Sequence, residues 1–562
     1  MLAKAHKAAG ARLCRALALA LIALPAWGAD FDSPLRSVAW AQMSDAARVA
    51  AVIGCVVIPL FMLCMLAAGG RKERRLGLAL VGVLALLSFE AGAATEYLNT
   101  SCAINGNGTA EACAATPGGA GAWNAGASVT YNAADIINIA RGTTVTDLPT
   151  SVSSQVTLQA YGTGADPIIS KNGTTFTLSI SAADVTLNDL AVRGNQSSAV
   201  ISTIGARTTI NRGSVYNNTT TNGIGIRFNN ASSDGAVNGT VIYDINDDGI
   251  GISATATGTF TLTNIVCYEI DKGASNGDCI QAYDGTAANV TVSGGNFTKE
   301  NGIKQAIRYS GSGTLRVING AVISAPVSGA QGISMEGSGI LQVERAYIIG
   351  SDGAPAIFAT NTGASYVRSS IIDGGEEGIW SSHASGTLDV FNNTIKGAFV
   401  AGIYHTTGGT LTAKNNFIDA PVNIYDASAG ATTVADYNRY GSGTFRIDGA
   451  AGVALAAWQS TTSQDANSAV AAPRFLGGDT PTTAEGFRLS ASSPLAAAGT
   501  DLGDEISDYF GDNMYNGKWD IGAFRRDSCY RRSRDGKLDM ARTRSQVVSR
   551  CLGIPGRYPE GL

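Results

Sequence analysis

Short apolar runs recur along the middle of the chain at intervals that suit strands rather than helices. A small residue followed by Ile recurs every 22 to 30 residues, at Ile224, Ile250, Ile280, Ile307, Ile333, Ile357, Ile379 and Ile403. A second marker lies between these positions, at Ile348, Ile372, Ile395 and Ile418. No repeat has the 3.6-residue period of a helix. Each repeat therefore predicts two or three short strands separated by Gly and Asn turns.

A repeat of about 24 residues cannot bury its apolar column alone. Stacked repeats can, because neighbouring strands lie about 4.8 Å apart and their Ile, Val and Leu side chains then form one continuous core. Asn residues in the turns are expected to form ladders; these are Asn392, Asn393, Asn415 and Asn416. The pattern predicts an all-β solenoid, a parallel β-helix of ten or more turns with its repeats in residues 151–430.

The composition agrees with a folded strand-rich chain. Gly accounts for 69 of 562 residues, and 45% of the residues are hydrophobic. Residues 95–524 carry 20 Lys and Arg against 36 Asp and Glu, which argues against nucleic acid as a partner. A polyanionic substrate would need a bridging cation. The tail 525–562 is basic, with 10 positive and 4 negative residues; it either docks on an acidic surface or is a solvated end, and we favour the second interpretation.

The first 94 residues are predicted to form hydrophobic α-helical export or membrane segments. Residues 1–29 resemble a signal peptide, and 49–70 are long and apolar enough to span a bilayer. The basic run 71–75 would then be cytoplasmic. Alternatively, translation from Met65 would produce a complete signal peptide ending near Ala94. Both interpretations place the body outside the cytoplasm, as a secreted, periplasmic or membrane-anchored protein.

Six of the nine cysteines fall in three close pairs. The pairs are Cys102 with Cys113, Cys267 with Cys279, and Cys529 with Cys551. In an exported chain, such local pairs predict three disulfides.

The chain resembles right-handed parallel β-helix proteins of the pectin-lyase-like superfamily over roughly residues 95–524. The resemblance implies an N-terminal cap with the first turns (95–150) and a closing segment (431–524). The pair Cys529 and Cys551 predicts that the basic tail (525–562) is closed by a disulfide. It implies a fold and not a chemistry, because this fold carries lyases, hydrolases, epimerases and adhesins.

Aligning the repeats on the marker Ile places residues of adjacent turns in columns. Two positions before Ile, the column reads Asn222, Asp248, Asp278, Gln305, Gln331, Pro355, Glu377 and Ala401. One position after Ile, it reads Gly225, Gly251, Gln281, Arg308, Ser334, Phe358, Trp380 and Tyr404. Asp248 and Asp278 should therefore lie about one strand spacing apart, near Asp247, Lys304 and Gln305. Two carboxyl groups so close raise one pKa, as a general acid requires.

The stretches "NDDG" and "GDC" around these aspartates are similar to motifs of polygalacturonase-type glycoside hydrolases. The resemblance implies that Asp278 is the proton donor and Asp248 its partner. The chain departs from that family at Gly277, which replaces an Asp, and at Gln305, where the family has a Gly-His-Gly turn. The family's later Arg-Ile-Lys motif is absent.

Two alternatives to this hydrolase interpretation remain open at this stage. A lyase would use Lys304 or Arg308 as the base, with calcium held by Asp247, Asp248 and Asp278. Both aspartates are also favoured turn residues, which would suit a non-catalytic adhesin or a structural protein of the envelope.

The remaining side chains are assigned by their column. Gln281, Gln305, Arg308, Trp380 and Tyr404 are the candidate substrate-binding residues, and the expected partner is a polysaccharide or cell-surface glycan. Phe358 is assigned to packing, and His383 and His405 are predicted to be surface residues.

Overall fold

In the computed structural model, the described residues are 93–229, 233–271, 277–302, 304–427, 432–503, 506–512 and 519–525. The chain divides into Met1–Ala94 and Thr95–Leu562. The predicted export segments and the predicted pair Cys529–Cys551 lie outside the described residues. Within the described part, no helix is long and apolar enough to cross a membrane.

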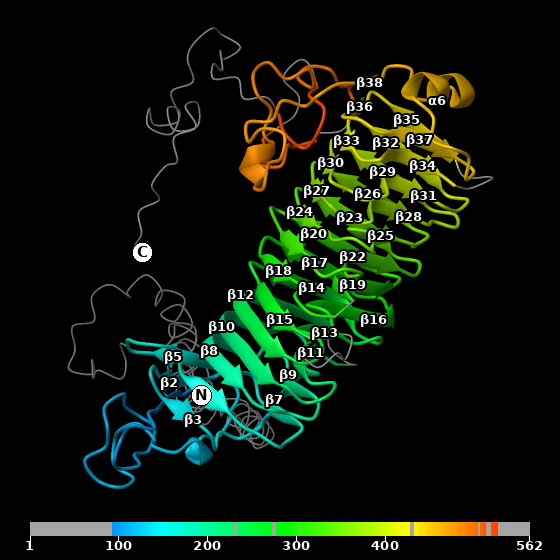
Figure 1. Ribbon diagram of the computed structural model, residues 1–562. Helices are drawn as coiled ribbons and strands as arrows, with labels where there is room; N and C mark the ends of the chain where they lie inside the picture. Colours follow the sequence, from blue (N-terminus) through cyan, green and yellow to red (C-terminus); the bar gives the residue numbers. More distant parts are fainter. Residues whose placement is uncertain are drawn as a thin grey trace, which may run out of the picture. The chain divides into compact units, whose positions relative to one another are not determined.

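The second unit is a coil of parallel strands in which each turn contributes to the same sheets (Figure 1). One sheet contains thirteen strands that pair in chain order. Its strands are β4 (Ser151–Val152), β7 (Phe176–Ile180), β9 (Ala199–Thr203), β11 (Ile224–Phe228), β13 (Ile250–Ile252), β16 (Ile280–Thr286), β19 (Gln305–Gly311), β22 (Gln331–Glu336), β25 (Ile357–Ala359), β28 (Glu377–Ser381), β31 (Ala401–His405), β34 (Val422–Asp426) and β37 (Thr444–Ile447).

Two further rows of strands close the coil. The first row consists of β1 (Thr95–Leu98), β2 (Asp135–Ala140), β5 (Val156–Tyr161), β8 (Thr186–Arg193), β10 (Thr208–Asn218), β12 (Ser233–Ile245), β14 (Thr257–Thr263), β17 (Asn289–Ser293), β20 (Thr314–Ile318), β23 (Ile340–Glu344), β26 (Ala364–Arg368), β29 (Thr387–Phe391), β32 (Thr410–Lys414) and β35 (Thr432–Asp436). The second consists of β3 (Thr144–Val145), β6 (Ile168–Ser170), β15 (Val266–Ile270), β18 (Asn296–Thr298), β21 (Val322–Ser324), β24 (Tyr347–Ile349), β27 (Ile371–Asp373), β30 (Thr394–Lys396), β33 (Phe417–Asp419), β36 (Arg439–Tyr440) and β38 (Ala469–Val470). The long strands β8, β10 and β12 join the two rows.

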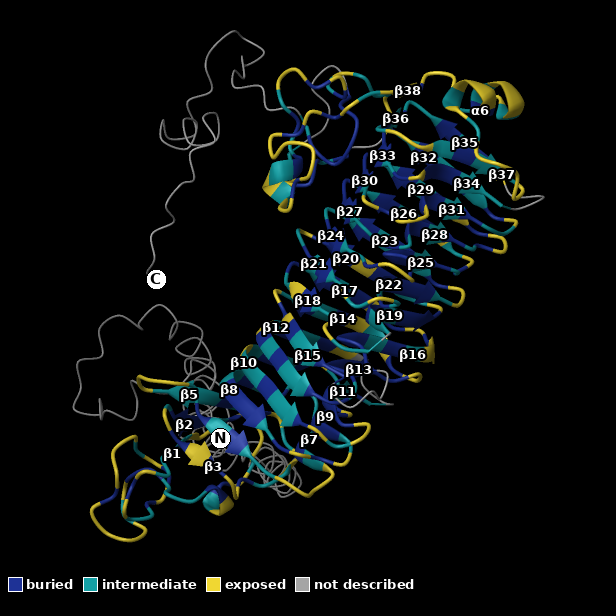
Figure 2. Cartoon of the chain, viewed as in Figure 1, coloured by how far each residue is buried: buried dark blue, intermediate teal, exposed yellow. Residues whose placement is uncertain are grey.

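The marker isoleucines form the core of the coil, as the sequence predicts. From Ile250 to Ile403 they pair on successive strands, and each is at most 1% exposed. The second marker pairs in the same way from Ile348 to Ile418. One prediction is wrong: Ile226, and not Ile224, lies opposite Ile250. Arg227 therefore replaces Gly225 in the outward column. Figure 2 shows the buried interior running through the coil.

The predicted Asn ladder exists, with Asn393 and Asn416 as predicted and Asn438 as an additional member. Asn393 donates through Nδ2 to Asn416 Oδ1, and Asn416 donates to Asn438 Oδ1, both at 3.1 Å and fully buried. The preceding residues, Asn392 and Asn415, have positive φ and donate instead to backbone carbonyls of the closing segment. The interior ladder ties successive turns together, and the outer pair holds the closing segment against the coil.

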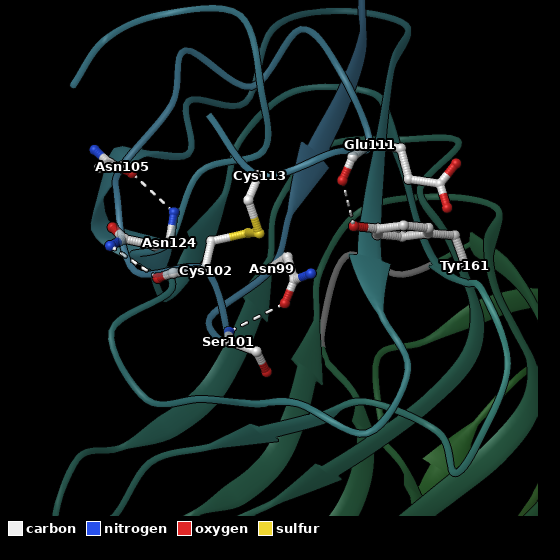
Figure 3. The surroundings of a disulfide bond; sticks show 8 residues. All are labelled: Asn99, Ser101, Cys102, Asn105, Glu111, Cys113, Asn124 and Tyr161. Atoms are coloured by element: carbon white, nitrogen blue, oxygen red, sulfur yellow. Dashed lines mark hydrogen bonds between the residues drawn. A yellow bond between two sulfur atoms is a disulfide. The ribbon is translucent and has the colours of Figure 1, made fainter. Parts of the chain in front are cut away.

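Both ends of the coil are covered. At the start, the Cys102–Cys113 disulfide and the hydrogen bond from Asn124 to the Cys102 carbonyl fix the cap (Figure 3). At the far end, the helix α6 (Leu455–Thr462) buries Trp458, which is 1% exposed. Short 3-10 helices η3 (Gly126–Ser128) and η4 (Ala484–Phe487) lie in the cap and the closing segment. The second predicted disulfide, Cys267–Cys279, also forms, with its Cα atoms 6.0 Å apart.

Candidate functional site

One cavity of about 210 Å³ contains the whole predicted polar cluster. It lies where the chain enters strands β13, β16 and β19, so three successive turns contribute to it. Its lining residues are Asp247, Asp248, Asp278, Gln281, Tyr283, Lys304, Gln305 and Arg308. The sequence analysis names seven of these eight, five of them in the two columns and Asp247 and Lys304 beside the columns, and Tyr283 is new.

Asp248 is held by hydrogen bonds at both carboxylate oxygens. Its Oδ1 accepts from the backbone N–H of Asp278 at 2.9 Å, and its Oδ2 accepts from the Tyr283 hydroxyl at 2.5 Å. The residue is 1% exposed. Burial, with Asp247 as a nearby negative charge, raises the pKa of Asp248 to about 7. The group therefore exchanges a proton near neutral pH.

Asp278 lies one turn further along the coil. Its Oδ1 accepts from the backbone N–H of Gln305 at 2.8 Å. Burial, followed by the charge of Asp248, raises the pKa of Asp278 well above its usual value. The Gln281 side-chain amide makes hydrogen bonds through both its nitrogen and its oxygen when the nitrogen faces the carboxylates. It then donates to Asp248 Oδ1 at 3.0 Å and Asp278 Oδ2 at 3.3 Å, and its oxygen accepts from Arg308 at 3.1 Å.

The positive side of the cavity is formed by Lys304 and Arg308. Arg308 donates to Glu336 Oε2 at 3.0 Å and to Asp284 at 3.3 Å. The Glu336 hydrogen bond raises the pKa of Arg308, so this guanidinium stays charged. Of the two bases that the sequence analysis considers, Arg308 is therefore unsuited to the role, which leaves Lys304 as the candidate.

The calcium site predicted at Asp247, Asp248 and Asp278 stays a prediction. Across the described residues, no group of three His, Cys, Asp or Glu side chains is placed to hold a metal ion. Both oxygens of Asp248 and one oxygen of Asp278 already accept from protein donors. Burial, together with Asp271, raises the pKa of Asp247. We therefore assign no step to calcium.

Trp380 and Tyr404 do not line this cavity. They lie in the same outward column, on strands β28 and β31, three and four turns beyond Arg308. Phe358 precedes them and packs edge-on against Trp380, with ring centroids 5.2 Å apart. The column continues through Tyr425 to Arg446, which lies over the Tyr425 ring.

The prediction that His383 and His405 are surface residues is wrong. Both are fully buried, and their Nδ1 atoms are 3.0 Å from the Ser381 hydroxyl and 3.2 Å from the Thr433 hydroxyl. The Nε2 atoms of both rings are buried without a hydrogen-bond partner. Ser381 and His405 pair across strands β28 and β31, on the inward face, because the alternation that buries Ile379 and Ile403 also buries them.

Sequence reasoning missed Tyr283 and Arg227. Tyr283 lies three residues after the marker Ile280, outside both columns. Its ring occupies the space above Gly251, where an added Cβ would lie 3.2 Å from the Tyr283 ring. The absence of a side chain at Gly251 is the signal that a neighbouring group fills this space. Arg227 was missed through the register error, and its charge opposes the rise that burial causes in the pKa of Asp247 and of Tyr283.

Residues 278–438 match the family described as "Right handed beta helix region". The match and the strand topology confirm the predicted right-handed parallel β-helix. No curated protein matches the chain. Among solved structures, a pectate lyase, Pel9A, is 16% identical, with a TM-score of 0.37 over 77% of this chain and 96% of its own. An alginate lyase from Paenibacillus sp. str. FPU-7 is 13% identical, with a TM-score of 0.24 over 57% of this chain and 91% of its own.

Proposed function

We propose that this protein is an exported carbohydrate-active enzyme that cleaves a polysaccharide in the Asp248–Asp278 cavity. The observation that carries the proposal is the pair of buried aspartates, each 1% exposed and each with a raised pKa, at one cavity. Buried carboxyl groups with pKa values near the working pH are suited to general acid–base chemistry.

The hydrogen bonds support different roles for the two aspartates. Asp248 is fixed at both oxygens, whereas Asp278 Oδ2 faces the Gln281 amide in the cavity. We assign Asp278 as the general acid that protonates the leaving sugar oxygen. Asp248 keeps the Asp278 pKa high through its charge and anchors the Asp278 backbone. Gln281, Gln305 and Arg308 orient the substrate.

Elimination is the alternative chemistry for the same cavity. A lyase removes a proton next to a carboxylate, and Lys304 would serve as the base with Arg308 neutralising the substrate carboxylate. The position of Arg308 beside Gln281 supports binding of an acidic sugar by this route.

A polysaccharide screen tests the proposal and separates the two chemistries. Purified protein is incubated with neutral and uronate polysaccharides, and the products are analysed for new reducing ends and for unsaturated sugars. Reducing ends without unsaturation indicate hydrolysis, and unsaturated ends indicate elimination. If the protein cleaves none of them and the Asp248→Asn/Asp278→Asn double variant behaves identically, the enzymatic assignment is wrong for these glycan classes.

A non-catalytic adhesin or envelope protein is the second candidate. It is favoured by the backbone contacts of the aspartates, since Asp248 and Asp278 each accept from a backbone N–H of the next turn. Turn-stabilising aspartates would make these contacts in a coil with no chemistry. An adhesin would bind glycan without cleaving it, and binding would survive substitution of Asp278.

The cysteines support an extracytoplasmic location for either candidate. Two disulfides form within the described residues, Cys102–Cys113 and Cys267–Cys279, and disulfides persist in oxidising compartments. Whether the protein is released or remains membrane-anchored through residues 1–94 depends on cleavage of those segments. Mass spectrometry of the mature N-terminus would decide between the two.

A further inference from the structure

Four aromatic side chains form a continuous ladder on the solvent side of the thirteen-stranded sheet. Phe358, Trp380, Tyr404 and Tyr425 occupy four successive turns, and each is partly exposed, whereas the alternate side chains of the same strands face the core. Their ring centroids are 5.2, 5.2 and 4.7 Å apart. This spacing is close to the length of one sugar unit in an extended polysaccharide.

The ring orientations distinguish this ladder from a packing ladder elsewhere on the coil. Tyr216, Tyr243 and Tyr268 lie on β10, β12 and β15 and stack almost parallel, with interplanar angles of 5° and 4°. Each of those rings covers the face of the next. In the ladder on the thirteen-stranded sheet, Phe358 and Trp380 are inclined by 74°, and Trp380 and Tyr404 by 46°. Inclined rings do not cover one another's faces, so ring surface at these three residues stays available for a ligand. The ladder ends in a stacked pair, because Tyr404 and Tyr425 are inclined by only 30° and Arg446 lies over the Tyr425 ring.

A polar group lies beside the ladder with unused hydrogen-bonding capacity. Glu377 is 5% exposed, and its Oε2 is buried without a hydrogen-bond partner. It is close enough to Tyr404 to raise the pKa of that phenol. Burial, followed by the negative charge of Glu376, raises the pKa of Glu377 itself to about 7. A buried carboxyl oxygen beside aromatic faces can accept a hydrogen bond from a sugar hydroxyl.

The ladder is continuous with the catalytic cavity. Gln281 and Arg308, which line the cavity, and Phe358, Trp380 and Tyr404 belong to one outward column interrupted only by Ser334. Glu377 stands two positions before its marker Ile, in the same column as Asp248 and Asp278. A chain lying along the coil axis would therefore meet both regions.

We propose that Phe358, Trp380, Tyr404, Tyr425 and Glu377 form a distal site for the neutral sugar units of a polysaccharide whose other end enters the Asp248–Asp278 cavity. The binding site stands on its own observations, and only its role as a set of distal subsites rests on the proposed enzymatic function. The occupant is neutral because Glu376 and Glu377 would repel a uronate at this place. The rings pack on the C–H faces of the sugars, and Glu377 accepts from a hydroxyl.

Affinity electrophoresis of the full-length protein tests this site without any need for cleavage. The gels contain mannan, xylan, galactan or β-glucan as neutral probes, and polygalacturonate as the acidic probe. We expect at least one neutral polysaccharide to retard the protein, and Trp380→Ala and Tyr404→Ala to weaken that binding about tenfold. Glu377→Gln should weaken it less, because an amide oxygen still accepts a hydrogen bond.

Tyr243→Ala is the matched control, since it removes one ring from the packing ladder on another sheet. It should bind as the wild type does, and circular dichroism of each variant confirms its fold. Asp278→Asn should also keep the wild-type retardation. Retardation without cleavage by the wild type would leave the distal site standing and refute the enzymatic proposal. The distal site is overturned if only polygalacturonate retards the protein, if nothing does, or if folded Trp380→Ala binds as tightly as the wild type.

Discussion

At the scale of single residues, Asp248 and Asp278 combine two roles that the sequence presents as alternatives. One oxygen of each accepts a backbone N–H of the following turn, as a structural turn residue does. The second oxygen of each is directed to Tyr283 or Gln281 at the cavity. The same residue type at the same position serves both roles, so the sequence alone could not choose between a turn and a site.

The pKa of Asp248 leads to a prediction about pH. A reaction that needs Asp248 charged and Asp278 protonated should gain kcat/KM as the pH rises through about 7, where Asp248 releases its proton. The Tyr283 hydrogen bond partly offsets the rise in the pKa of Asp248, so Tyr283→Phe should move this acid limb to higher pH. The measurement is the pH profile of kcat/KM for both proteins.

Tyr309→Phe is a suitable control for Tyr283→Phe. Tyr309 is a buried tyrosine of β19 whose hydroxyl donates to the Ala288 carbonyl, outside the cavity. Its removal should leave the acid limb in place. An unchanged limb in Tyr283→Phe would mean that Asp248 does not set the pH dependence.

The column alignment predicted which polar residues meet, but not how deeply each is buried. Seven cavity residues follow from repeat register, because a parallel coil converts sequence spacing directly into neighbouring positions. His383 and His405 were assigned to the surface because polar residues usually are. The strand alternation instead turns His405 inward, and His383 is buried two residues past the end of β28. A hydroxyl partner for each Nδ1 makes their burial tolerable.

At the scale of the strand and its turn, the buried histidines predict a loss of stability in acid. Burial, followed by the proximity of His405, lowers the pKa of His383 to about 4 from 6.5. The unfolded chain then binds more protons than the folded one between these values, so stability falls as the pH drops from about 6.5 to about 4. His383→Asn should remove up to about 3 kcal/mol of this acid-induced loss in the free energy of unfolding.

Urea unfolding of the wild type and His383→Asn at several pH values measures this difference. The comparison between the two proteins is needed because Asp248 has a raised pKa and acts in the opposite direction, with stability falling as the pH rises toward 7. Identical pH dependence in both proteins would show that His383 is not held in its neutral form.

The interior Asn ladder should carry more stability than a similar ladder at the surface. Asn416 makes hydrogen bonds to both neighbouring turns and is fully buried. Asn416→Ala leaves buried backbone groups without hydrogen bonds and should lower the free energy of unfolding by about 3 kcal/mol. Asn211 joins Asn188 and Asn238 in the same manner but is partly exposed. Asn211→Ala should cost less than about 1 kcal/mol, because water replaces the lost bonds.

Thermal or urea denaturation of the two Asn variants checks this contrast. Equal costs would indicate that burial of the ladder adds nothing to its strength. At this scale the sequence predicted a ladder from the paired Asn residues. It did not show which Asn of each pair faces inward, because Asn392 and Asn393 are adjacent and face opposite directions. The positive φ of Asn392 and Asn415 sets that direction.

Repeat register also explains why one turn was misaligned. The stretch "NGIGIRF" contains two isoleucines two residues apart, Ile224 and Ile226, and both are buried. Either could follow the small residue that marks a turn. The pairing of Ile226 with Ile250 settles the register and places Arg227 in the outward column. A two-residue shift leaves the inward alternation intact, so hydrophobic pattern alone could not detect it.

At the scale of the whole coil, the fold was predictable because each turn repeats the same arrangement of short strands. The core needs only an apolar residue at each inward position, and the sequence shows these at regular intervals. The chemistry was less predictable, because it depends on the few turns where inward and corner positions become polar. Those turns lie together at β13, β16 and β19, and the aromatic turns follow at β25, β28, β31 and β34 along the same column.

The central claim is that Asp278 is a catalytic acid. The most direct test is the cleavage rate of Asp278→Asn on the polysaccharide that the wild type degrades. Asn keeps an oxygen for the Gln305 N–H, so the variant should fold and yet lose at least about 100-fold in kcat. Asp184→Asn, which changes an exposed carboxylate paired with Arg207, is the matched control and should cleave at the wild-type rate. Wild-type turnover by a folded Asp278→Asn would contradict the account and leave Asp278 as a turn residue.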